Sequence, residues 1–323
     1  MSVTIKDLAR ETGLTPATIS AYFNGGNVRG YNKAKIESAI EKLGYIRNDF
    51  ARGLRTHRSR TIGVLLPEIA NKFSTSIISE TEESLRSRGY GIIVCDCRSN
   101  VKREREAVRF LLSKMVDGLI VIAEDTGAGA CLAATQNGVP VVAVDRMTEN
   151  PLLSHVIINN REVSKNAVNM LINRGNKRIT AVCGDLGIYT AAERFAGYKE
   201  AMREAGLEGE IRYVNGDLSI EGGYKAAKKA LEEGGGHALF VTNYEMSMGA
   251  VMAAKEMGFT AGSDMDFMGF DSLDYFKPFC PGIMTVRQPV KELGRVAAET
   301  IVSMIDGGPA RNIVLGAEIR LAA

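Results

Sequence analysis

Polar side chains that could bind a small molecule follow several short apolar runs of this sequence. Asp145, Asn243 and Asp271 each come directly after such a run, and Arg194 lies near the start of a predicted helix. Because ligands of parallel α/β sheets collect at the carboxyl ends of the strands, we expect these residues to line one cleft. Carboxylates and arginine together can hydrogen-bond the vicinal hydroxyls of a polyhydroxylated ligand. A second interpretation is that Asp145, Arg194 and Asp271 form salt bridges within the scaffold.

The residue types needed for catalysis or metal binding are sparse. The three histidines (His57, His155 and His237) are far apart, and the five cysteines are scattered. Cys95 and Cys97 lack the CxxC spacing of metal and redox pairs, and they share one face of a predicted strand, where buried small apolar residues are expected. No glycine-rich phosphate loop follows the first strand, and the sequence has no P-loop motif. We therefore expect no enzyme, no metal and no cofactor.

The elements that would position these residues alternate between strand and helix from Thr61 onward. Continuous apolar runs are typical of strands buried on both faces. The expected strands cover residues 61–67, 91–95, 118–122, 138–145, 155–159, 178–184, 213–215, 238–242 and 266–270. The expected helices cover residues 74–88, 103–114, 162–174, 192–205, 222–232, 247–257 and 290–304. This alternation predicts two α/β units with doubly wound parallel sheets and a ligand cleft between the two lobes.

Residues 1–60 differ in charge from the rest of the chain. They contain 11 Lys and Arg against 5 Asp and Glu, whereas residues 61–323 contain 29 against 33. A basic head on a mildly acidic body indicates that the head alone meets a polyanion. The first residues are polar, unlike a signal peptide, and no apolar run reaches the ~18 residues of a membrane span. We therefore expect a cytoplasmic protein that has no membrane partner.

Three short helices are expected in this head, over residues 5–12, 16–24 and 32–43. Thr4 and Asp7 can form a capping box for the first helix, while Thr15 caps the second and Pro16 occupies its first turn. Two helices joined by a turn of about four residues have the helix-turn-helix spacing, which places the second helix against base edges in the major groove. The alternative is a structural three-helix bundle that binds no nucleic acid.

The second helix combines a face that can be buried with a face that can contact a partner. Ile19 and Phe23 lie four residues apart and are expected in the core of the head. The opposite face carries no large or charged residue; it consists of Pro16, Ala17, Ser20, Ala21 and Asn24. Beyond the third helix, residues 48–60 place four arginines around Leu54, which suits an apolar wedge in the minor groove.

Four stretches of the head carry a recognisable signature: TIKDLA at 4–9, TIS at 18–20, LGYIRN at 43–48 and ARGLR at 51–55. They resemble the N-terminal signature of the lactose-repressor and galactose-repressor family of bacterial transcription regulators. In that family the second helix reads the major groove, and a hinge helix places a leucine, here Leu54, in the minor groove. The resemblance implies operator contacts by Thr4, Thr15, Pro16, Ala17, Thr18, Ser20, Ala21, Asn24, Asn48, Ala51, Leu54 and Arg55.

The second helix departs from the family pattern at the residues that usually choose bases. The family commonly has an arginine where this chain has Ala21, and Pro16 and Ala17 occupy the two other positions. A bidentate contact from arginine to guanine supplies about 1–3 kcal/mol of discrimination. Its loss predicts an unusual operator, read through thymine methyl contacts from Ala17 and Ala21 and through the hinge.

The resemblance continues through the body, from Ile62 to about Leu321. The stretches that carry it are NKFS at 71–74, VDR at 144–146, TAAERFAGY at 190–198, TNYEM at 242–246, GFDS at 269–272 and TVRQP at 285–289. They are similar to motifs of the family's periplasmic-binding-protein-like effector domain. The implied effector contacts are Phe73, Ser74, Asp145, Thr190, Arg194, Asn243, Asp271 and Gln288.

Several positions of the implied pocket depart from the family pattern. They are Ser74, Leu218, Tyr244 and Ser272. In addition, Ile188 stands where the purine-responsive member of the family has an arginine. This difference disfavours a purine corepressor and favours a sugar or sugar phosphate.

The resemblance also implies how the chain is divided. It predicts an all-α helix-turn-helix head at 1–47, a hinge helix or linker at 48–60, and an effector-binding and dimerisation domain at 61–323. The first lobe is expected at about 61–158 and 290–323 and the second at about 159–289, with three crossings of the chain between them. Two heads that read two half-sites require a two-fold homodimer. Its surface is expected at helices near 74–88 and 278–285.

The expected function is a ligand-responsive repressor that binds double-stranded operator DNA in genes for carbohydrate uptake or catabolism. Effector binding would change the closure of the lobes and thereby the affinity for the operator. Two alternatives share the predicted body, namely a sugar-binding protein that serves a transporter and an α/β enzyme that acts on a sugar. The basic head argues against the first, and the missing catalytic constellation argues against the second.

Overall fold

The computed structural model describes residues 3–46, 58–122, 130–234, 238–261, 264–271, 280 and 282–320. Four of the predicted operator contacts, Asn48, Ala51, Leu54 and Arg55, lie outside these residues, as does Ser272. The chain divides into two compact units, a head at 1–59 and a body at 60–323.

The head consists of α1 (Ile5–Thr12), α2 (Pro16–Phe23) and α3 (Gly30–Leu43). The predicted caps are present, because Thr4 and Asp7 form a capping box and the Thr15 hydroxyl accepts a hydrogen bond from the Thr18 amide. Satisfying these orphan amides stabilises helices that are too short to persist alone. The buried core of the head is formed by Leu8, Ile19, Val28, Ile36, Ala39 and Tyr45.

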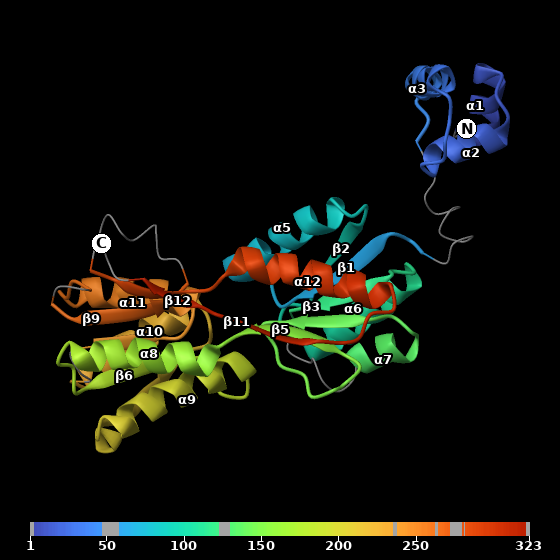
Figure 1. The fold of residues 1–323 in the computed structure, drawn as a ribbon. Helices are drawn as coiled ribbons and strands as arrows, with labels where there is room; N and C mark the ends of the chain where they lie inside the picture. The colour runs from blue at the N-terminus through green and yellow to red at the C-terminus, as the bar shows by residue number, and fades with distance from the viewer. Residues whose placement is uncertain are drawn as a thin grey trace. The chain divides into compact units, whose positions relative to one another are not determined.

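The first lobe of the body contains a six-stranded parallel sheet. Its strand order is β11-β5-β4-β3-β1-β2. The strands are β1 (Thr61–Leu66), β2 (Gly91–Asp96), β3 (Gly118–Val121), β4 (Val141–Val144), β5 (Ser154–Ile158) and β11 (Asn312–Leu315). The helices are α5 (Lys72–Arg86), α6 (Val101–Ser113), α7 (Ala130–Gln136) and α12 (Val290–Ile305). Figure 1 shows α5 and α12 side by side over this sheet.

The second lobe repeats this architecture with one difference. Its strand order is β12-β10-β9-β8-β6-β7, and β12 runs antiparallel to β10. The strands are β6 (Ile179–Cys183), β7 (Arg212–Asn215), β8 (Ala238–Val241), β9 (Asp266–Phe270), β10 (Met284–Arg287) and β12 (Glu318–Arg320). The helices are α8 (Asn160–Asn173), α9 (Tyr189–Glu204), α10 (Ile220–Glu232) and α11 (Tyr244–Glu256). The predicted fold class, a helix-turn-helix head and a two-lobed α/β body, is confirmed.

Alternate residues of each buried strand supply two separate apolar layers. In β1, Ile62 and Val64 join the core under α5 and α12, whereas Leu65 joins the core under α6 and α7. In the second lobe, Ala181 faces the layer of α8 and α9, and Val182 faces the layer of α10 and α11. This two-sided burial explains why the strands are continuous apolar runs in the sequence.

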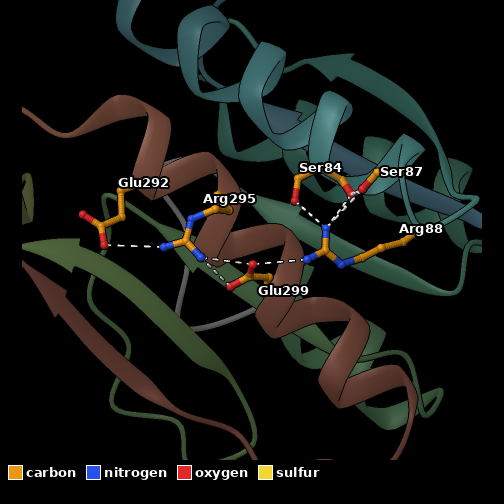
Figure 2. A network of polar contacts seen from close by, with 6 residues as sticks. All are labelled: Ser84, Ser87, Arg88, Glu292, Arg295 and Glu299. Atoms are coloured by element: carbon orange, nitrogen blue, oxygen red, sulfur yellow. Dashed lines mark hydrogen bonds and ion pairs between the residues drawn. The ribbon is translucent and has the colours of Figure 1, made fainter.

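Helices α5 and α12 cross without room for a side chain at Gly294. A Cβ atom at this position would lie 2.7 Å from the Ile77 carbonyl oxygen, and the Thr81 hydroxyl donates to the Gly294 carbonyl over 3.3 Å. Beyond this crossing an exposed network joins the helices, in which Arg88 pairs with Glu299 at 3.1 Å (Figure 2). Glu299 also pairs with Arg295 at 2.9 Å, so one carboxylate holds arginines from both helices.

Three crossings of the chain join the lobes, after β5, after β10 and after β11. The first and third crossings are bonded to one another, because the Asn159 amide donates to the Leu315 carbonyl over 3.0 Å. The side chain of Asn159 then accepts from the Ala317 amide over 2.9 Å. Such a paired crossing can bend as a unit when the lobes move.

Two expectations about the body are corrected. The tail was expected in the first lobe as far as residue 323, but β12 pairs with β10 in the second sheet, so the first lobe ends near Leu315. Residues near 278–285 were expected to be helical, but Met284 and Thr285 begin strand β10. Both corrections concern short strands whose residues alternate in exposure and therefore form no continuous apolar run.

Candidate functional site

A cavity lies between the lobes and is lined by residues from both. It encloses about 450 Å³, part of it open to solvent. The first lobe contributes Lys72, Phe73 and Ser76 from α5 and Val290 from α12, and the second contributes Tyr244, Asp271, Arg287 and Gln288. Phe73, Asp271 and Gln288 are therefore brought together as predicted, whereas the other five predicted contacts lie outside this lining.

Asp271 and Gln288 form a polar pair at the ends of β9 and β10. The Gln288 side-chain amide donates to the Asp271 carboxylate over 2.8 Å. Burial raises the pKa of Asp271 to about 6, although the Arg194 guanidinium and the Gln288 hydrogen bond both oppose this rise. The Gln288 Oε1 atom is buried and has no hydrogen-bond partner among the described residues. It is thus an acceptor that a ligand hydroxyl could satisfy.

Arg194 is a buried cation that the scaffold holds firmly. Its Nε donates to Asn160 Oδ1 over 2.8 Å, and its Nη1 donates to the Thr242 carbonyl over 2.6 Å. The guanidinium also lies 4.0 Å from the centroid of the Phe270 ring. Burial lowers the pKa of Arg194, and the nearby carboxylates of Asp145 and Asp271 oppose that effect. Arg194 is therefore held by contacts within the scaffold, as the second interpretation of the sequence predicts. It also lies near the carboxylates of the candidate site, as the first interpretation predicts.

Asp145 directly follows β4 and lies in the left-handed region, with φ of 60°. One carboxylate oxygen accepts from Arg146 Nη1 over 2.9 Å, while Oδ1 is buried without a partner in the described part of the chain. A non-glycine residue with positive φ is uncommon and often marks a functional position. Asp145 and Arg146 are both largely buried, so the first lobe places a buried ion pair near the site but outside the cavity lining.

Ser74, Thr190 and Asn243 lie at the starts of helices near the site. Ser74 and Thr190 are buried in the first turns of α5 and α9. Asn243 caps α11, because its Oδ1 accepts from the Met246 amide over 2.9 Å. Its Nδ2 donates to the Leu218 carbonyl and to Glu245. The side chain of Asn243 therefore makes its hydrogen bonds to the scaffold.

Two contacts between the lobes were not predicted. The Asn71 side chain donates to Glu245 Oε1 over 3.0 Å, and the Lys72 ammonium lies 5.3 Å from the centroid of the Tyr244 ring. Burial raises the pKa of Glu245 to about 7, and the charges of Asp271 and Glu68 add to this rise. The signal for these residues was weak in the sequence, because each is an ordinary polar residue in the first turn of a helix.

The outer face of α2 is small and partly exposed. Thr15, Pro16, Ala17 and Asn24 are exposed, whereas Thr18, Ser20 and Ala21 are half-buried. Ala21 was expected on the outer face, but it packs against the core of the head, and the turn that follows α2 covers it. The Gly26 amide donates to the Ala21 carbonyl over 2.8 Å.

Tyr22 links α2 to α3. Its hydroxyl donates to Glu37 over 3.0 Å, and its ring lies edge-on to Phe23. The predicted partner Phe23 is half-buried, so Ile19 is the residue of α2 that is fully enclosed. These contacts fix the orientation of α2, which leaves Pro16 and Ala17 as its most exposed surface.

Other kinds of site find little support in the described residues. No group of three His, Cys, Asp or Glu side chains among them could hold a metal ion. Cys97 is buried, and burial raises the pKa of its thiol to about 12. No helix in the described segments is long and apolar enough to cross a membrane.

Comparison with known proteins assigns both parts of the chain. Residues 4–48 match the family described as bacterial regulatory proteins, lacI family. Residues 59–318 match periplasmic binding proteins and sugar binding domain of LacI family. The chain is similar to catabolite control protein A of Priestia megaterium, with 32% identity over 310 residues that cover 95% of this chain and 93% of that protein.

Two further similarities extend over nearly the whole chain. The HTH-type transcriptional repressor CytR of Escherichia coli (strain K12) is 29% identical over 95% of this chain and 91% of that protein. The crystal structure of the Lac repressor dimer bound to operator and the anti-inducer ONPF matches with a TM-score of 0.87 and 25% identity. That match covers 100% of this chain and 99% of the other chain.

Proposed function

The chain belongs to the lacI family of bacterial regulatory proteins, and we propose that it is a repressor of genes for carbohydrate uptake or catabolism that responds to a sugar or sugar phosphate. It is a DNA-binding transcription regulator and not an enzyme. The observation that supports this function is that one chain contains both a helix-turn-helix head and a two-lobed body of this family.

The head binds double-stranded operator DNA, and α2 is the element we assign to the major groove. Its exposed residues Thr15, Pro16 and Ala17 can approach bases closely because none has a long side chain. Small side chains contact thymine methyl groups but supply no bidentate donor to guanine. We propose that the segment 48–60, with Leu54 as a wedge and its arginines on phosphates, supplies much of the affinity.

The cavity between the lobes is the site we assign to the effector. Its two sides come from different lobes, so a ligand that contacts both favours the closed arrangement over the open one. Closure would move the starts of the two lobes relative to each other and alter the positions of the heads. Reciprocity then requires the operator to change effector affinity by the same factor.

The protein binds operator as a homodimer, which the two-fold symmetry of half-sites requires. We place the dimer surface on the first lobe, near α5, and we place the protein in the cytoplasm, where its operator is. A sugar-binding protein of a transporter would share the body but has no use for residues 4–48.

The decisive experiment selects duplexes from a random pool with the full chain and then measures their affinity by fluorescence anisotropy. We expect one palindromic sequence to bind at least 1,000-fold more tightly than random DNA, within the range typical of specific binding. Adding sugars and sugar phosphates one at a time should shift this affinity for at least one compound. Selection that enriches no sequence would contradict the proposal.

A further inference from the structure

We propose that Arg60, Tyr90 and Asp117 form an anchor that fixes the direction in which the chain leaves the body for the head. Through this anchor the body sets the half-site spacing that the operator must have. The inference rests on the proposed function, because it takes the operator to contain two half-sites.

Arg60 has a backbone conformation that its residue type rarely adopts. It is the first residue of the body and directly precedes β1. Its φ is 55°, in the left-handed region, where a residue with a side chain is uncommon. Such a conformation is strained and persists only where the surrounding structure holds it from several sides.

The contacts that hold Arg60 come from both strands that flank β1. Strand β1 lies between β2 and β3 in the sheet, and Tyr90 and Asp117 directly precede those two strands. The Asp117 carboxylate accepts a hydrogen bond from the Arg60 amide over 3.0 Å. The Gly91 amide donates to the Arg60 carbonyl over 2.9 Å, and the Arg60 guanidinium lies 5.0 Å from the centroid of the Tyr90 ring. The backbone and the side chain of Arg60 are thus both held.

The two partners of Arg60 are themselves fixed by the first lobe. The Asp117 amide donates to the Thr61 carbonyl over 2.8 Å, so Asp117 holds two successive residues of the incoming chain. Tyr90 is 3% exposed and belongs to the buried core. Its hydroxyl finds no partner in the described part of the chain, which indicates that the face of the ring, and not the hydroxyl, serves the anchor.

The direction of the chain at Arg60 bears on how a dimer reads DNA. Residue 60 begins the body, and residue 59 ends the unit that contains the head. A change of φ at Arg60 would redirect all of the chain that precedes it. In a two-fold dimer, two fixed exits impose one spacing on the half-sites. Two exits without a fixed direction would instead act as loose tethers that accept several spacings.

The experiment measures, by fluorescence anisotropy, how strongly the full-length protein depends on half-site spacing. The probes are the selected duplex and derivatives that have one or two base pairs inserted at the centre. Two inserted base pairs rotate one half-site by roughly 70° relative to the other, so the wild type should bind at least about tenfold more weakly.

Two variants release the anchor in different ways. Arg60→Gly removes the contact with the Tyr90 ring, and glycine adopts a φ of 55° without strain, so the body should keep its melting temperature. Asp117→Ala removes the acceptor of the Arg60 amide. Both variants should bind the lengthened duplexes within about threefold of the selected duplex, because their tethers have no fixed direction.

The matched control is Asp96→Ala, which breaks the same kind of contact elsewhere in the first lobe. Asp96 accepts a hydrogen bond from the Arg98 amide over 3.0 Å, and Arg98 also has positive φ, of 48°. This pair lies at the carboxyl end of β2, whereas the anchor lies at the amino end of β1. Asp96→Ala should therefore keep the spacing dependence of the wild type.

The ratio of affinities for the two spacings is the deciding quantity. Loss of a phosphate contact by the Arg60 guanidinium would weaken all duplexes evenly and leave this ratio unchanged. If Asp117→Ala fails to fold, Arg60→Gly decides alone. A ratio in Arg60→Gly equal to that of the wild type, or an equally relaxed ratio in Asp96→Ala, would overturn the inference, as would a wild type that binds every spacing equally.

These outcomes differ from a failure of the proposed function. A wild type that selects a palindromic duplex and rejects the longer spacing, together with variants that reject it as strongly, would leave the repressor intact and remove only the anchor. A wild type that selects no duplex at all would contradict the function itself.

Discussion

Asn71 and Glu245 join the two lobes of the body through a hydrogen bond of 3.0 Å between Nδ2 and Oε1. They are 174 residues apart in sequence and occupy the starts of α5 and α11. Glu245 Oε2 accepts a second hydrogen bond, from Asn243 over 2.9 Å. The Glu245 carboxylate therefore accepts hydrogen bonds from both lobes, so its charge bears on how the lobes are held together.

Replacing Glu245 with glutamine should make the stability of the body less dependent on pH. The pKa of Glu245 rises to about 7 in the folded body from an ordinary 4.5. Because the folded state binds the proton more tightly, stability falls as pH rises from about 4.5 to about 7 and is constant above that. Across this pH range the wild type should lose about 1–2 kcal/mol of its free energy of unfolding through Glu245, and Glu245→Gln should not show this loss. Urea unfolding at pH 5 and pH 8 measures the difference.

Asp271 adds a decline of the same sign to the wild-type profile, since its pKa also rises, to about 6. In Glu245→Gln, the slope of the free energy of unfolding against pH should therefore be smaller than in the wild type but not zero, because Asp271 still contributes. A pH profile identical to that of the wild type would show that Glu245 is not the group responsible.

Replacing Arg194 with methionine should destabilise the body by about 3–5 kcal/mol, as expected for breaking a buried charge network. The change leaves Asn160 Oδ1 and the Thr242 carbonyl without their donor. It also removes the cation beside Asp145 and Asp271. Urea unfolding, followed by the circular dichroism of the body, measures the loss.

Arg161 provides the matched control on the neighbouring helix. Its side chain is 50% exposed and pairs with Glu193 at 2.7 Å. Exposed pairs of this kind contribute about 0–1 kcal/mol, so Arg161→Met should have a small effect. Similar losses in the two variants would refute a special role for the buried arginine.

Replacing Gly294 with alanine should separate α5 from α12 and destabilise the first lobe by about 1–3 kcal/mol, as overpacking does. The added Cβ would lie 2.7 Å from both the Ile77 carbonyl oxygen and the Glu80 Cβ, and neither can retreat far. Gly209→Ala is the control, because nothing lies within 4 Å of a Cβ placed there. Thermal unfolding of both variants tests the difference, and equal melting temperatures would count against a tight crossing.

Most of the fold could be predicted because burial on both faces leaves a readable pattern. Strands such as β1, β3 and β4 are continuous apolar runs. Helix α7 and strands β10, β11 and β12 were not predicted. The three strands are at most four residues long and alternate in exposure. Strands β11 and β12 lie at the edges of their sheets, and β10 lies next to β12. Their position depends on partners far away in the sequence rather than on local composition.

The candidate site could be predicted only where it follows directly from strand ends. Asp145 and Asp271 were expected together because the carboxyl ends of the strands of both lobes were expected to face one cleft, and both carboxylates lie close enough to influence Arg194. Lys72, Tyr244 and Glu245 were missed as contacts, because they come from helices of different lobes that are far apart in the sequence. The pattern of apolar residues within α5 or within α11 carries no information about the distance between the two helices.

Introducing arginine at position 21 should give α2 a preference for guanine that the natural protein lacks. Ala21 is half-buried beneath the turn at Gly26, and an arginine side chain is long enough to extend past that turn toward the groove. A bidentate contact should discriminate by about 1–3 kcal/mol, or roughly tenfold to 100-fold at one base step. The control is Ala34→Arg, which adds the same charge at an exposed position of α3 and should raise affinity for all duplexes evenly. Selection of duplexes with the three proteins compares them directly. If Ala21→Arg also strengthened every duplex evenly, position 21 would not face the bases, and the assignment of α2 to the major groove would fail.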